Sequence, residues 1–108
     1  MTPSGQPGEP LPGAHRVTWT YALSRADLAR LLPRLLAPQP VVLTGDRLHC
    51  VWPDGRQLRI EFGAETERRL ASLRLRDTTF TFVFEAWDEA QIRAFLVHCT
   101  RGLQQGGG

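Results

Sequence analysis

Two adjacent pairs of histidine and cysteine, His49–Cys50 and His98–Cys99, are the residues of this sequence best suited to metal chemistry. Imidazole and thiolate groups are common zinc ligands. The spacing argues against a zinc site, because neighbours on a strand point to opposite faces and neighbours on a helix diverge by about 100°. We therefore expect no metal site, and we expect Cys50 and Cys99 to lie in the core as free thiols.

The carboxylates of the sequence do not form an acid–base pair that the pattern can place. Asp54 falls in a turn and Asp88 in a helix cap, whereas Glu61 and Glu85 fall at outward positions of strands. General acid–base catalysis needs such groups together in a cleft. The sequence also lacks the glycine-rich phosphate loops and the nucleophile elbow of known enzymes. We therefore predict that the protein is not an enzyme and has no catalytic residue and no cofactor.

Arginine dominates the surface that the sequence is expected to expose. All 13 basic residues are arginine, and with 11 acidic residues the formal charge is +2. Arginine suits phosphate and carboxylate recognition, but codon usage in a GC-rich genome also favours it, and so small a charge does not by itself make a polyanion-binding protein. The residues that we expect on an interaction face, projecting from an open sheet, are Arg16, Arg47, His49, Arg59, Arg74 and Arg76.

A strand and a helix are expected at the start of the folded unit. Apolar residues alternate from 16 to 23, which predicts a half-buried strand. Ser24 is placed to cap the following helix, and Pro33 predicts a kink or a split into two short helices. The buried stripe of this helix is expected to be Leu28, Leu31, Leu32, Leu35 and Leu36.

A meander of strands follows. Gly45–Asp46 predicts a two-residue hairpin, and a three-residue loop with Gly55 in the left-handed conformation keeps the next strand's apolar residues on the same face. The expected cross-strand pairs are Leu43 with Leu48, Val41 with Cys50, Cys50 with Leu58, and Leu48 with Ile60.

A last hairpin is expected around Asp77–Thr78, between strands 70–76 and 79–85, with residues 63–67 as a connection. This hairpin would set Leu75 opposite Phe80 and Leu73 opposite Phe82. It would also turn Arg74 and Arg76 to the same outer face as Thr79 and Thr81. The stripe of Phe80, Phe82 and Phe84 is the strongest strand pattern in the chain.

The second helix begins at Asp88, with Gln91 completing a capping box. The sequence thus predicts an α+β fold, β-α-β5-α: one mostly antiparallel meander sheet with two helices packed on one face. Residues 1–14 are expected to be a disordered tail, 15–103 the single domain and 104–108 a flexible tail. No segment is long and apolar enough to cross a bilayer, and no signal peptide is recognisable, so a cytoplasmic location is expected.

This order of elements resembles two known architectures, the β-α-β4-α half of a TATA-binding protein and a shortened helix-grip fold. The first implies an open sheet that binds a polymer, and the second implies a lined cavity. The expected fold has one strand more than the first, and the chain is short for the second. Such a likeness of topology does not fix function.

The leading interpretation is a small protein-interaction module, with self-association through a sheet edge or the open face as one form. Nucleic-acid binding by the arginine face is the first alternative, although inward-facing phenylalanines leave no aromatic residues there for base stacking. The second alternative is a small apolar ligand held between helices and sheet, against Trp19, Tyr21 and the phenylalanines. No membrane partner is expected.

Overall fold

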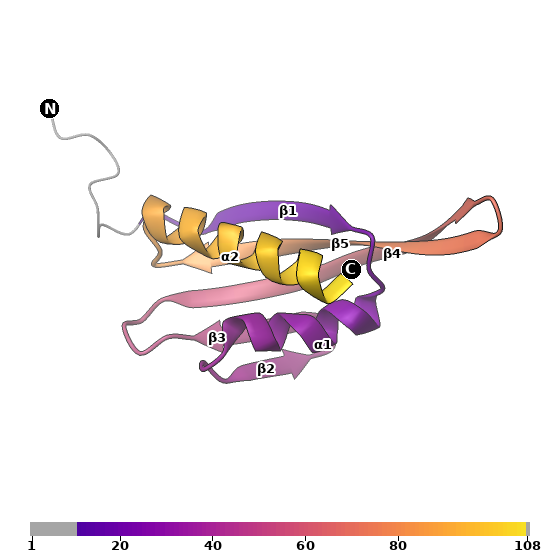
Figure 1. Cartoon of the computed structure of the whole chain (residues 1–108). Helices are drawn as coiled ribbons and strands as arrows, with labels where there is room; N and C mark the ends of the chain where they lie inside the picture. Colours follow the sequence, from indigo (N-terminus) through magenta and orange to yellow (C-terminus); the bar gives the residue numbers. More distant parts are fainter. Residues whose placement is uncertain (1–10, 108) are drawn as a thin grey trace, which may run out of the picture.

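Five antiparallel strands form an open sheet, in the order β1-β5-β4-β3-β2, in a computed structural model that describes residues 11–107. The elements are β1 (His15–Tyr21), α1 (Arg25–Leu36), β2 (Val41–Thr44), β3 (Arg47–Val51), β4 (Gln57–Leu70), β5 (Leu73–Glu85) and α2 (Glu89–Gly107). Both helices lie on the same side of the sheet (Figure 1). The predicted class, α+β with an antiparallel sheet and two helices on one face, is confirmed.

The hydrophobic core lies between the sheet and the helices. Phe80, Phe82 and Phe84 line one face of β5 and are fully buried, as the alternation predicts. The same core contains the leucine stripe of α1, the strand residues Leu48, Cys50, Leu58, Ile60 and Phe62, and Trp87, Ile92, Cys99 and Leu103 from α2 and the residues before it. Burial of this much apolar surface is the main force that holds helices and sheet together.

The first two hairpins have the predicted registers. Leu43 pairs with Leu48, and Cys50 pairs with Val41 on one side and Leu58 on the other. Both turns depend on glycine, because Gly45 and Gly55 have φ angles of 57° and 96°, a region that side chains disfavour.

The predicted hairpin around Asp77–Thr78 is wrong. β5 runs straight through these residues, and the turn lies at Ala71–Ser72, where Leu70 pairs with Leu73. The two strands expected at 70–76 and 79–85 therefore merge into one strand, β5, and its partner β4 runs through the expected connection 63–67 as far as Leu70. The sheet thus has five strands, and the order of elements is β-α-β4-α. The extra strand that separated the expected fold from the half TATA-binding protein is thus absent.

Local contacts explain why the chain does not turn at Asp77–Thr78. The carboxylate of Asp77 pairs with Arg68 across the hairpin, and the hydroxyl of the buried Thr78 donates to the Leu23 carbonyl at 2.8 Å. Polar residues that usually favour turns are thus satisfied within a strand. A bulge in β4 between Phe62 and Glu65 marks the place where the long hairpin leaves the sheet body. We call residues 65–78 the arm; Figure 1 shows it extending beyond the rest of the sheet.

The helix caps follow the sequence. The Ser24 hydroxyl accepts a hydrogen bond from the Asp27 amide at 3.1 Å. Asp88 and Gln91 form both bonds of the predicted capping box, at 2.9 and 2.7 Å. Pro33 does not split α1, which continues to Leu36, and α2 continues past the expected end near residue 103 to Gly107.

The two helices touch each other at Gly102. A Cβ atom at this position would lie 2.1 Å from a methyl carbon of Leu35. One turn away, the His98 imidazole is 2.8 Å from the Leu35 carbonyl oxygen. The missing side chain of Gly102 therefore permits the close approach of α2 to α1.

Most of the proposed tail 1–14 lies outside the described residues. The first described residue, Leu11, donates its backbone N–H to the Trp87 carbonyl at 2.8 Å. Among residues 11–107, no helix is both long and apolar enough to cross a membrane.

The Phe82→Ala variant tests the core. We expect it to lower the free energy of unfolding by about 3–5 kcal/mol, because it removes a fully buried ring between sheet and helices. The matched control is Val97→Ala on α2, at a side chain that is 45% exposed, where we expect a change within about 0.5 kcal/mol. Guanidinium melts of both variants provide the measurement. Equal losses would contradict this description of the core.

The thiols provide a second test. Burial raises the pKa of Cys50 and raises that of Cys99 to about 12. At about pH 8 we therefore expect no reaction with Ellman's reagent in the folded protein and reaction of both thiols after unfolding. The pKa of Cys99 is higher in the folded protein than in the unfolded chain. The free energy of unfolding is therefore unaffected by this thiol below about pH 8.5, and it falls as the pH rises above that value, because only the unfolded thiol then loses its proton. Rapid labelling of the native protein would contradict the burial of these residues.

Candidate functional site

Four of the six predicted interaction residues share the sheet face opposite to the helices. Arg16 lies on β1, Arg47 and His49 on β3, and Arg59 on β4. The predicted placement of Arg74 and Arg76 on this face is wrong, because they lie on the arm on the opposite face from Thr79 and Thr81. Because β5 has no turn at 77–78, its side chains alternate without interruption, so the even-numbered residues 74 and 76 and the odd-numbered residues 79 and 81 point to opposite faces.

The half of the open face over β1, β5 and β4 is covered by its own side chains. Arg16 pairs with Glu61 at 3.4 Å, and Arg59 pairs with Glu61 at 3.2 Å and Glu85 at 3.6 Å. These side chains lie over Val83, which pairs with Arg16 and Arg59 on the neighbouring strands and is only 1% exposed. Two arginines of the predicted face are therefore already bound to carboxylates.

Two further observations show that this half is satisfied. Burial tends to raise the pKa of Glu61, but hydrogen bonding from Arg59 and the charges of Arg16 and Arg59 outweigh it and lower the pKa. The facing threonines of β1 and β5 bond through their hydroxyls at 2.9 Å in two pairs: Thr18 with Thr81, and Thr20 with Thr79. Little hydrogen-bonding capacity of these groups is left for a ligand.

The other half of the open face differs. Here β2 and β3 present Val42, Thr44, Arg47, His49 and Val51, which we call the β2–β3 surface. Val42 is 60% and Val51 47% exposed. A hollow of about 350 Å³ is lined by four of these residues together with Gln57 and Arg59 on β4. Apolar and cationic groups thus meet in one open depression.

The polar groups of this hollow are incompletely used. Within the described part of the chain, Arg47 has no carboxylate partner. The His49 ring contacts the Gln57 side-chain oxygen at 3.3 Å, a long hydrogen bond. The nearest acids by register, Glu61 and Glu85, are held by Arg59. A carboxylate from another molecule would find a free guanidinium here.

The described residues hold no constellation for metal or nucleophilic chemistry. No group of three or more His, Cys, Asp or Glu in this part of the chain is placed to hold a metal ion. Both cysteines are free and buried. Trp19 and Tyr21, proposed as walls of an apolar ligand site, pack on the phenylalanines with ring centroids 5.2 Å (Trp19–Phe82) and 6.1 Å (Tyr21–Phe80) apart.

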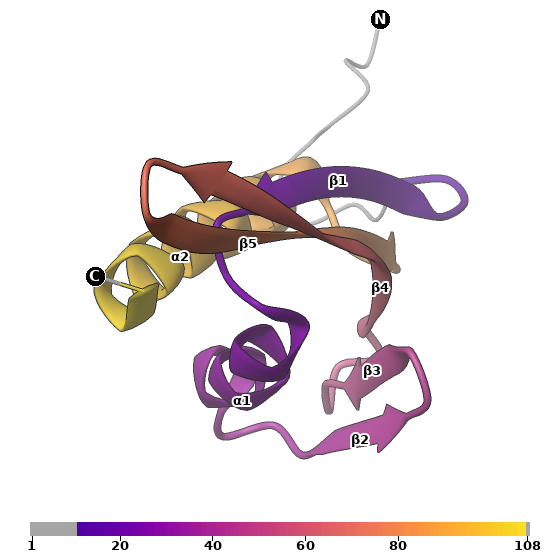
Figure 2. The same cartoon turned by 90° about the vertical axis from the view of Figure 1, so that its right-hand side faces the viewer.

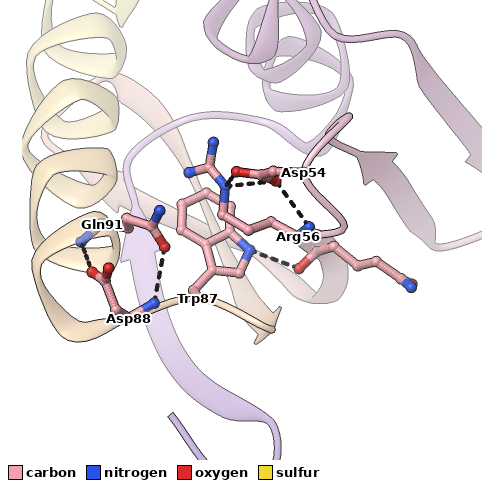
Figure 3. A network of polar contacts seen from close by, with 6 residues as sticks. Asp54, Arg56, Trp87, Asp88 and Gln91 are labelled. Carbon is pink, nitrogen blue, oxygen red and sulfur yellow. Dashed lines mark hydrogen bonds and ion pairs between the residues drawn. The ribbon is translucent and has the colours of Figure 1, made fainter. Parts of the chain in front are cut away.

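Sequence reasoning missed one cluster, in which an arginine packs on two tryptophans. The Arg56 guanidinium carbon lies 5.3 Å from the Trp52 ring and 4.7 Å from the Trp87 ring. Asp54 pairs with Arg56 at 2.8 Å, and the Trp87 indole N–H donates to the Gln57 carbonyl at 2.8 Å (Figure 3). The Arg56 amide above all, and then the Arg56 charge, lower the pKa of Asp54. Figure 3 also shows the Asp88–Gln91 capping box beside the cluster.

This cluster has a structural role. It joins the turn between β3 and β4 to the residues just before α2, and cation–π packing contributes at such sites. The guanidinium of Arg56 fills the space over both indole rings. The only sequence signal was the presence of Trp52 and Arg56 on either side of a turn, which does not reveal the distant partner Trp87.

Comparison with known proteins adds no functional assignment, since no family model, no curated protein and no solved structure matches this chain. The function must therefore be inferred from the exposed surface itself, and the β2–β3 surface is the candidate site.

Proposed function

We propose that this protein is a non-enzymatic protein-interaction module that contacts its partner through the β2–β3 surface. The observation that supports this proposal most strongly is the exposed Val42 in one hollow with the unpaired Arg47, with the exposed Val51 on the same sheet face. Arginine and exposed apolar residues are typical of protein interfaces, where the apolar area supplies affinity and the charge supplies specificity. We also propose that the protein acts in the cytoplasm, where buried free thiols stay reduced.

The arm provides a second exposed apolar surface. Leu70 and Leu73 at its end are 61% and 59% exposed, and beyond Thr78, which pairs with Tyr21 of β1, the strands of the arm pair only with each other. A two-stranded hairpin is marginally stable alone in water. Contact with a second copy of the chain through these leucines is the form of self-association that this surface favours.

Nucleic-acid binding by the arginine face has less support. Arg16 and Arg59 are paired with glutamates, and phosphate binding would require these pairs to break. Arg74 and Arg76 lie on the other face of the arm, where they pair with Glu67 and Glu65. The arginines therefore do not form one continuous cationic surface on the open sheet.

Site-specific photo-crosslinking in cells tests the interaction proposal. We expect a benzoyl-phenylalanine in place of Val42 to capture a partner protein, because this side chain is exposed beside Arg47. The same group in place of Thr81, on the self-paired half, is the matched control and should capture much less. A third variant at Leu73 should yield a dimer of the chain if the arm mediates self-association. Capture from position 81 that equals capture from position 42 would contradict the choice of surface.

The nucleic-acid alternative has its own test. Fluorescence anisotropy with mixed-sequence DNA and RNA at low salt should show no binding that weakens steeply as salt rises, because few unpaired arginines are available to displace counterions. An Arg47→Glu variant serves as the comparison. A steep, Arg47-dependent salt slope would favour nucleic-acid binding over the interaction module.

A further inference from the structure

β2 is a free edge of the sheet. It pairs with β3 on one side, and no described strand pairs with it on the other (Figure 2). In a two-residue hairpin, the residues that flank the turn form a hydrogen-bonded pair, here Thr44 with Arg47. Because such pairs alternate along an antiparallel ladder, the backbone N–H and C=O groups of Leu43 and Val41 point to the free edge. These groups can bond to an added strand.

The side chains along this edge are exposed on both faces of the sheet. Val42 belongs to the β2–β3 surface, and Leu43, on the helix side, is 56% exposed. A second hollow of about 350 Å³ lies beside Leu43; its lining also includes Ala26 and Ala29 of α1, Phe62 of β4 and Gly45, together with the charged Arg25 and Glu65. An added strand would therefore meet an apolar hollow on one face and the cationic hollow with Arg47 on the other.

Arg25 holds this edge in place. Its guanidinium donates to the Gly45 carbonyl at 2.9 Å and pairs with Asp46 at 2.6 Å, so the β2–β3 turn is tied to the start of α1. The same guanidinium lies 5.4 Å from the centre of the Phe62 ring, and the Arg25 amide donates to Glu65. The edge and the apolar hollow are thus preorganised, which lowers the entropic cost of binding.

We propose that β2 binds an extended segment of a partner protein by strand addition, and that this segment alternates apolar and acidic side chains. The proposal rests on the proposed function and deepens it. Backbone bonds to residues 41 and 43 supply a common anchor. Because neighbouring side chains of a strand point to opposite faces, the apolar ones enter the hollow beside Leu43 and the acidic ones face Arg47 and His49.

Charge distinguishes this partner from a second copy of the chain. Pairing of two β2 edges around a two-fold axis would place two β2–β3 surfaces on the same side of a joined sheet. Neither copy would bring an unpaired carboxylate from this surface to the other's Arg47, because Glu61 and Glu85 are held by Arg59. An acidic segment from another protein satisfies the guanidinium, and a second copy does not.

The other edge of the sheet is less suited to this role. On β1 the open-face threonines are bonded to β5, and on the helix side Trp19 and Tyr21 pack on the core. A strand added there would gain backbone bonds but few free side-chain contacts. The two exposed side chains and two hollows beside β2 favour β2.

A labelled peptide in which valine and glutamate alternate is the probe for this proposal. We expect fluorescence anisotropy to show binding to the wild-type protein and a loss of affinity of about tenfold or more for Arg47→Glu. A peptide in which valine alternates with lysine should bind the wild-type protein weakly. Its affinity should be no higher than that of the glutamate peptide for the Arg47→Glu variant. Amide shifts in NMR spectra should be largest for residues 41–44 and their neighbours on β3.

Backbone methylation tests strand addition without altering the protein. In one peptide the amides of the valines are methylated, and in a second those of the glutamates. Methylation should abolish binding only in the peptide whose methylated amides would face β2, because the amides methylated in the other peptide point to solvent. On the protein side, Leu43→Pro removes an outward N–H and should abolish binding, whereas Leu43→Val keeps this group and should retain it.

Several outcomes would overturn the strand-addition proposal: equal binding of the two methylated peptides, equal binding of the lysine peptide, or shifts centred on β1 or the arm. If crosslinking from position 42 captures a partner while either peptide result is negative, the interaction module stands and strand addition fails. If the peptides bind as expected but crosslinking in cells captures nothing, the edge is a strand-binding site and the proposed cellular function fails.

Discussion

The burial of three phenylalanines on one face of β5 is the interaction on which the rest of this structure depends. β5 lies between β1 and β4, so Phe80, Phe82 and Phe84 have strands on both sides. The rings pack on one another and on Phe95 and Trp87 from the region of α2. Because the side chains of a strand alternate, fixing these rings inside also fixes which residues of every paired strand face outward. The open face is a consequence of the core.

The same alternation explains which features could be predicted from the sequence. Gly45 and Gly55 mark turns with positive φ, and the apolar pattern then leaves one register for β2, β3 and β4. The turn at Ala71–Ser72 has no such signal, since Ala71 reaches a φ of 56° without being glycine. In the sequence, Asp77–Thr78 resembles a turn. The partners that hold these two residues within a strand, Arg68 and the Leu23 carbonyl, lie elsewhere in the sequence and meet them only in the folded chain.

The candidate site was predictable only in part. Alternation alone places Arg47, His49 and Arg59 on one face, but the parity of Arg74 and Arg76 changes when the supposed turn is removed. Which arginines are already paired depends on strand order, because Arg16 reaches Glu61 across β5 only when β1 and β4 flank that strand. Composition counts guanidinium groups, but it cannot separate those held by carboxylates from Arg47. That distinction divides the open face into a self-satisfied half and a half able to bind.

The contact between the two helices at Gly102 is connected, through α1, to the hollow beside β2. At Gly102, which has no side chain, α2 closely approaches α1 and meets Leu35 near the end of that helix. Ala26 and Ala29, which line the hollow beside β2, lie on the same rigid helix about two turns away. A larger side chain at Gly102 would first displace the flexible end of the Leu35 side chain, and only bulk beyond what this end can yield would move α1 itself. Such a movement would also reach the hollow beside β2, which Gly102 does not line.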